Sequence, residues 1–216
     1  QGAEWFRTMC VLSAVVWAIT AWILARSIRK NKSAERPSNT ALDFIQKSPT
    51  TSRLRFALFC AISVGVIERV WRISESLWFD EISALIDYAQ YGPGAIFGTY
   101  FVQSNHVLHT LLTWCALTIA GGVSEPVLRM PAFLAGIASI AAIVALVREA
   151  ALWQGVTTRA RMSLVCGIAA LSPIMVLESV EARGYSMMIL FAALASWMFL
   201  RALRIGSPMS WVAYAI

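Results

Sequence analysis

Charge is what this sequence has least of: Asp, Glu, Lys and Arg make up only 14% of its 216 residues, whereas a soluble domain carries about 25%. It also lacks a glycine-rich phosphate loop, an HExxH helix, a nucleophile elbow and a dinucleotide-binding fingerprint. Soluble nucleotide-dependent chemistry therefore has no support. Hydrophobic residues reach 58% and gather in several long uncharged runs, which is typical of an integral membrane protein.

Paired cysteines are missing as well. The four cysteines each lie alone in a different apolar run, and no two have the spacing of metal ligands: Cys10, Cys60, Cys115 and Cys166. Single thiols in separate membrane helices form no disulfide framework. We therefore expect them to be small buried side chains of the helices.

The distribution of basic residues predicts how the chain crosses a membrane. Residues 1–25 hold an apolar run long enough to span, and the basic, proline-containing residues 26–53 follow it. By the positive-inside rule this segment is a cytoplasmic linker, which we favour over a nucleic-acid-binding segment. A second span, residues 54–73, then runs outward and delivers an acidic loop to the non-cytoplasmic face.

Three later apolar runs predict further spans over residues 130–147, 162–180 and 185–200, and residues 205–216 begin another and stop within it. By length, residues 107–120 form a further candidate span. We favour a re-entrant or interfacial helix there, because the arginines after residue 147 then fall on the cytoplasmic side. The predicted fold is an all-α polytopic membrane helix bundle, and we expect the chain to be a piece of a longer protein.

The loop after the second span begins with two neighbouring acids, Asp80 and Glu81. On a helix they diverge by about 100°, so one can face a substrate while the other holds structure or a cation. Asp80 is then a candidate general base for an acceptor hydroxyl. The alternative is a solvated helix start that the macrodipole favours. Apolar residues at helical spacing predict a short interfacial helix after the acids, ended by a Gly-Pro-Gly sequence: Ile82, Leu85, Ile86 and Ala89.

Two histidines and an arginine follow. His106 and His109 have a spacing found in metal sites, but no third ligand is near, and capping or a wet polar stripe explains both. Ser104 or Asn105 is the expected N-cap of the helix over residues 107–120. Arg129 is expected to anchor a helix start at the interface, with a phosphate contact as the alternative.

A dense polar cluster follows the run that ends at residue 180: Glu178, Glu181, Arg183 and Tyr185. Arg183 has the fork geometry that binds two phosphate oxygens. The alternative is a charged loop in which Arg183 pairs with one of the two glutamates. The predicted topology brings Asp80, His106 and Arg183 to one membrane face.

Several short motifs occur in one order along the chain: Ser76-Leu77-Trp78-Phe79-Asp80-Glu81, Asn105-His106-Val107-Leu108, Leu128-Arg129-Met130-Pro131 with Gly136, Ser172-Pro173, and Glu181-Ala182-Arg183-Gly184-Tyr185-Ser186. As an ordered set they resemble the GT-C-type polytopic membrane glycosyltransferases. The nearest likeness is to the family 39 protein mannosyltransferase-like and lipopolysaccharide-core glycosyltransferase-like group, and the aminoarabinose transferases are similar too. The likeness covers residues 54–204, the N-terminal part of the catalytic module.

The resemblance implies two juxtamembrane helices in the first outer loop and an inverting sugar transfer with Asp80 as catalytic base and Glu81 beside it. The donor would be a sugar on a polyprenyl or dolichyl phosphate, and the acceptor a hydroxyl of a glycan, lipid or protein. The leaving phosphate needs no proton, but its charge needs an arginine or a cation nearby. A divalent cation is therefore compatible with the sequence but not required by it. The implied substrate-binding residues are Asn105, His106, Arg129, Glu181, Arg183 and Tyr185.

The chain departs from the family pattern in two respects. The span within residues 1–25 is extra, and the later spans that help to form a lipid-donor groove are missing, so we expect the 216 residues alone to be inactive. The expected location is a bacterial plasma membrane with the site facing outside, and no nucleic acid partner is expected. Two other interpretations stay open: a transporter or flippase-like protein whose charged residues line a path, and a non-catalytic scaffold subunit.

Overall fold

The computed structural model describes residues 49–100, 102–153 and 159–215. Within these ranges the chain is helical and contains no strand, which confirms the all-α prediction for them. The predicted first span and all but the last residues of the predicted linker lie outside the described residues.

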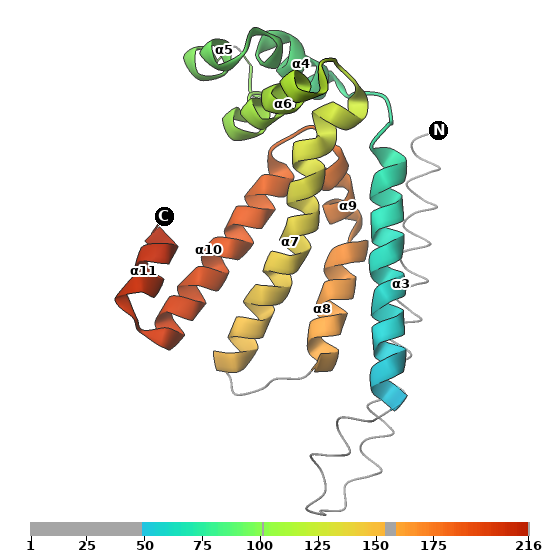
Figure 1. Cartoon of the computed structure of the whole chain (residues 1–216), viewed down its shortest axis with the longest axis vertical. Helices are drawn as coiled ribbons and strands as arrows, with labels where there is room; N and C mark the ends of the chain where they lie inside the picture. Colours follow the sequence, from blue (N-terminus) through green and yellow to red (C-terminus); the bar gives the residue numbers. More distant parts are fainter. Residues whose placement is uncertain (1–48, 101, 154–158, 216) are drawn as a thin grey trace, which may run out of the picture.

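The long helices stand side by side, and the short helices after α3 lie across one end of them (Figure 1). The long ones are α3 (Pro49–Arg72), α7 (Glu125–Trp153), α10 (Tyr185–Ile205) and a column in which α9 (Pro173–Val180) continues α8 (Arg159–Leu171). The crossing layer holds α4 (Phe79–Asp87), the 3-10 turn η1 (Ala89–Tyr91), α5 (Pro93–Gly98) and α6 (Val107–Ala120). α6 lies in this layer, across the ends of the long helices (Figure 1). A last helix, α11 (Pro208–Ala215), packs against α10.

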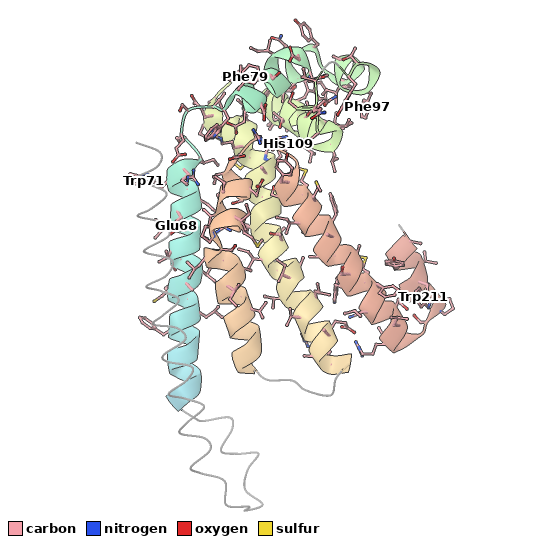
Figure 2. All side chains as sticks on the ribbon, turned by 180° about the vertical axis from the view of Figure 1, so that it is seen from behind. Glu68, Trp71, Phe79, Phe97, His109 and Trp211 are labelled. Carbon is pink, nitrogen blue, oxygen red and sulfur yellow. The ribbon has the colours of Figure 1, made fainter. Side chains whose placement is uncertain are left out.

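Two helices are long and apolar enough to cross a membrane, Glu125–Leu152 within α7 and Tyr185–Ile205, which is α10. Only 28% and 22% of their most apolar stretches are buried, whereas a core helix of a soluble protein is mostly buried. α3 shows the same pattern, because Phe59 and Trp71 are 68% and 74% exposed on it. On the short helices the exposed aromatic side chains include Phe79 and Phe97 (Figure 2). These uncovered apolar faces favour a membrane environment.

Residues 162–180 were predicted to form one span, and the structure has two helices there instead. The break lies at Ser172, whose ψ of 120° is extended. Pro173 has no N–H to donate and disfavours the helical conformation of the residue before it. The carbonyl of Ala170 is left without a helical partner and accepts a hydrogen bond of 2.8 Å from Nη1 of Arg69. The break is therefore stabilised from α3.

Other helix ends also differ from the predicted ones. α3 begins at Pro49, within the predicted linker, since a proline fits the first turn, where its missing N–H needs no partner. α7 and α10 are longer than the predicted spans over residues 130–147 and 185–200, because hydropathy marks only the apolar part of a helix. α10 ends at Gly206, whose φ of 69° is left-handed.

The connecting segments hold two further corrections. The Gly-Pro-Gly sequence was expected only to end a helix, yet Pro93 also begins α5. The N-cap of α6 is His106, rather than Ser104 or Asn105, and no side chain caps that helix.

Gly136 allows α7 and α9 to touch. A Cβ built on it would lie 2.1 Å from Cβ of Ser179, so even alanine should force the helices apart. We expect Gly136→Ala to destabilise the protein by about 1–3 kcal/mol. Gly167→Ala is the matched control, because its Cβ would lie 3.8 Å from the nearest atom, Cβ of Ala61. Thermal unfolding in detergent checks this, and equal midpoints for the two variants would contradict the close approach.

Candidate functional site

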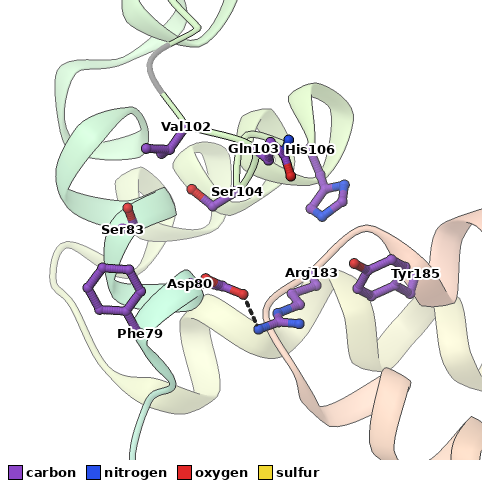
Figure 3. A pocket seen from close by; sticks show the side chains of 9 residues that line it. All are labelled: Phe79, Asp80, Ser83, Val102, Gln103, Ser104, His106, Arg183 and Tyr185. Carbon is purple, nitrogen blue, oxygen red and sulfur yellow. Dashed lines mark hydrogen bonds and ion pairs between the residues drawn. The ribbon is translucent and has the colours of Figure 1, made fainter.

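A pocket of about 250 Å³ opens where the crossing layer meets the loop between α9 and α10 (Figure 3). α4, the segment before α6, and the α9–α10 loop each contribute to it. The lining residues are Phe79, Asp80, Ser83, Val102, Gln103, Ser104, His106, Arg183 and Tyr185. The structure thus brings together four of the predicted site residues from segments far apart in the chain: Asp80, His106, Arg183 and Tyr185.

Asp80 and Arg183 face each other across this pocket and form an ion pair through Oδ2 and Nη2. The Asp80 side chain is half exposed and that of Arg183 is 24% exposed. Glu181 is a second acidic neighbour of Arg183, with its Oε2 atom 3.7 Å from Nε of that arginine. Burial raises the pKa of Glu181, and the charge of Arg183 acts against that rise. Glu181 therefore neighbours the pocket arginine without lining the pocket.

Glu81 points the other way, into the protein, and is 1% exposed. Nε and Nη2 of Arg129 donate to its two oxygens at 2.9 and 2.7 Å, and the backbone N–H groups of Trp78 and Ala182 donate to the same carboxylate. Burial alone would raise the pKa of Glu81, but these hydrogen bonds outweigh it and lower the pKa. Through these hydrogen bonds, the Glu81 carboxylate connects the start of α4 to α7 and to the α9–α10 loop.

Arg129 is itself fully enclosed, at 1% exposed. Besides Glu81, its guanidinium donates to the carbonyls at the end of α3 and just beyond it, on Arg72, Ile73, Glu75 and Ser76. The carbonyl of Arg72 also accepts a hydrogen bond from the N–H of Glu75 at 3.0 Å. Carbonyls at a helix end lack the N–H that would follow them in the helix, and Arg129 supplies donors in its place. Arg129 does not line the pocket, and Glu81 faces away from it. Of the two roles left open for Glu81, these contacts favour holding structure, and they give no support to the alternative of a phosphate contact for Arg129.

The two acids therefore divide as their spacing predicted. Both lie in the first turn of α4, where consecutive side chains point about 100° apart. Asp80 faces the pocket and Glu81 faces the interior. The alternative of a simple solvated helix start does not describe this pair, because each acid has a specific arginine partner from a distant segment.

His106 and Tyr185 line the pocket on the side of Arg183 (Figure 3). Their rings meet edge to face, with centroids 5.2 Å apart. Gly184 leaves room for this contact, since a Cβ on it would lie 3.0 Å from Cβ of His106. Burial and the charge of Arg183 lower the pKa of His106, while Asp80 opposes the shift. The imidazole is thus held neutral at pH 7 as a hydrogen-bonding group.

Asn105 and His109 are not in the pocket. The Nδ2 atom of Asn105, which is 5% exposed, donates to the carbonyl of Ile96 at 3.0 Å, so this residue joins α5 to α6 rather than binding substrate. His109 is 3% exposed, on the inner side of α6. In the described part of the chain, no three His, Cys, Asp or Glu side chains are grouped closely enough to hold a metal ion.

Sequence reasoning missed five lining residues: Phe79, Ser83, Val102, Gln103 and Ser104. Helical spacing would have found Ser83, which is three residues after Asp80 and shares its helix face. Nothing comparable marks Val102, Gln103 and Ser104, because they lie in a non-helical segment whose path follows from tertiary contacts.

The comparisons with known proteins leave the site to be interpreted from its own geometry. No family model matches the chain, and no curated protein or solved structure matches it significantly.

Burial of His109 gives the stability of the protein a pH dependence. Burial lowers the pKa of His109 to about 4, and the neighbouring His106 adds to this effect. The unfolded chain takes up this proton near pH 6.5. The free energy of unfolding is therefore undiminished by His109 above about pH 6.5. Between about pH 6.5 and pH 4 it falls by about 1.4 kcal/mol per pH unit, because only the unfolded chain binds the proton.

We expect His109→Gln to flatten this dependence. Thermal unfolding at pH 7.5 and pH 5 should show a larger fall in midpoint for the wild type than for the variant. The same fall in both proteins would show that His109 is not buried neutral.

Proposed function

We propose that the chain is the N-terminal part of a catalytic module of a GT-C-like membrane glycosyltransferase. In this proposal the full-length enzyme transfers a sugar from a polyprenyl-phosphate donor to a hydroxyl acceptor at the non-cytoplasmic face. The observation that carries this proposal is the Asp80–Arg183 pair in an open pocket, because it sets a base beside a cation that can receive a leaving phosphate.

The roles follow from the chemistry of the transfer. Asp80 accepts the proton of the acceptor hydroxyl, and the oxygen attacks the anomeric carbon from the side opposite the phosphate. The bond between that carbon and the phosphate oxygen breaks with inversion. Arg183 stabilises the charge on the leaving phosphate. His106 and Tyr185 provide further hydrogen-bonding groups in the same pocket, where a sugar would lie.

The surroundings support a lipid-linked donor. The pocket lies at the end of the long helices, next to apolar side chains such as Phe79, which is 81% exposed. In this proposal α7 and α10 cross the membrane together with α3 and the α8–α9 column. α4, α5 and α6 lie at its outer surface, in the place of the juxtamembrane helices of GT-C-type enzymes. The proposed location is a bacterial plasma membrane.

Membranes that contain the full-length protein test the function when they are given radiolabelled polyprenyl-phosphate hexoses and pentoses. An enzyme moves label from the lipid to an acceptor, whereas a transporter moves the intact donor across the membrane and a scaffold does neither. The proposal predicts acceptor-bound label that depends on this protein. Intact donor after incubation with every sugar, in membranes holding folded protein, would contradict it.

A further inference from the structure

The ion pair in the pocket uses only half of the donor edge that an arginine offers. A guanidinium binds anions side-on through Nε–H and Nη2–H together. Arg129 uses both groups on Glu81, at 2.9 and 2.7 Å. Arg183 donates Nη2 to Asp80, but its Nε is buried and has no hydrogen-bond partner among the described residues. The Oε2 atom of Glu181 is 3.7 Å from this Nε, beyond hydrogen-bond range.

The two pairs also differ in what surrounds them. The Glu81–Arg129 pair has almost no exposed surface, since its side chains are 0% and 2% exposed. The Asp80 side chain is 50% exposed and borders the open pocket (Figure 3). Ion pairs in contact with water contribute little to stability. A ligand that enters the pocket can therefore replace Asp80, whereas no ligand reaches Arg129.

We infer that the Asp80–Arg183 pair is a resting state that the phosphate of the donor breaks by exchange. This inference rests on the proposed function. An oxygen of the phosphate takes the place of the Asp80 carboxylate at Nη2 of Arg183, while Nε stays buried beside Glu181. Asp80 is released in the same step, and its oxygens become available to the acceptor hydroxyl. The base is thus set free only when the donor is in place.

Charge explains why the phosphate exchanges with Asp80 rather than joining it. In the resting site, one guanidinium already stands between the carboxylates of Asp80 and Glu181. A phosphate added beside Asp80 would bring like charges into contact, which is strongly unfavourable. The phosphate and Asp80 therefore compete for one arginine edge.

Binding of farnesyl phosphate to the full-length protein in nanodiscs tests this competition without any sugar transfer, with farnesol as the uncharged control probe. We expect Asp80→Asn to bind farnesyl phosphate about tenfold more tightly than the wild type, a change of about 1.4 kcal/mol. Arg183→Gln should bind it at least tenfold more weakly, and the double variant should match Arg183→Gln. Asp87→Asn removes an acid from the same helix outside the pocket and should leave the affinity unchanged.

The inference is overturned if Asp80→Asn binds no more tightly than the wild type, or if the wild type does not prefer farnesyl phosphate to farnesol. Unfolding midpoints close to that of the wild type show that each variant is folded, and Asp80→Ala gives a second measurement of the same competition. Transfer activity without competition would remove this inference alone. Competition without sugar transfer would contradict the proposed function. Arg183 would then be an anion-binding residue that pairs with Asp80 when no anion is bound.

Discussion

Replacing Arg129 by methionine is expected to destabilise the protein by about 3–5 kcal/mol, enough to prevent a small protein from folding stably. Arg129→Met leaves Glu81 buried as an unpaired carboxylate and leaves the carbonyls at the end of α3 without their donor. The start of α4 then loses the hydrogen bonds between Glu81 and Arg129 that connect it to α7. Thermal unfolding in detergent, or expression level where the variant does not fold, measures this effect.

Two comparisons make that prediction specific. Arg183→Met removes the arginine partner of Asp80, the acid next to Glu81. Because Asp80 is half exposed, the unfolding midpoint of this variant should stay close to that of the wild type. The double variant Glu81→Met with Arg129→Met should recover part of the loss, because it leaves no buried charge unpaired. Equal destabilisation by Arg129→Met and Arg183→Met would contradict the contrast between the two ion pairs.

The separation of these two pairs shows how far the sequence could lead. Helix periodicity predicts that neighbouring acids in a first turn diverge, and so it predicts that Asp80 and Glu81 do different things. It cannot tell which arginine belongs to which acid, because the partners are 103 and 48 residues away. In the sequence, Arg129 stands directly before a long apolar run, where an interface anchor is expected. Only the structure shows that Arg129 is buried and that its guanidinium donates to the backbone at the end of α3.

The fold was predictable in the same uneven way. Hydropathy locates the apolar helices, since an uncharged run is sufficient to mark them, and it places α6 in a separate layer through the charges that follow. It does not detect the break between α8 and α9, because Ser172 and Pro173 lie within an apolar run and prolines also occur inside helices, as Pro131 does in α7. At the break, Arg69 donates a hydrogen bond to the carbonyl of Ala170, a tertiary contact that the sequence pattern does not show.

Asp80→Asn is expected to lower sugar transfer by about 100- to 10,000-fold, the usual contribution of a general base. Asparagine keeps the shape of the side chain and a hydrogen bond acceptor for Arg183, but it does not take up the proton of an acceptor hydroxyl. The variant should fold, because Asp80 is half exposed and fastens no buried group. Asp87→Asn, on the same helix and outside the pocket, should keep wild-type activity.

The most direct test of the account is the initial rate at which label passes from a polyprenyl-phosphate sugar to acceptor, compared between wild-type and Asp80→Asn full-length protein at equal folded amounts. The account predicts transfer by the wild type and by Asp87→Asn, with no more than about 1% of that rate for Asp80→Asn. Undiminished transfer by folded Asp80→Asn would contradict the central claim that Asp80 is the base of this pocket.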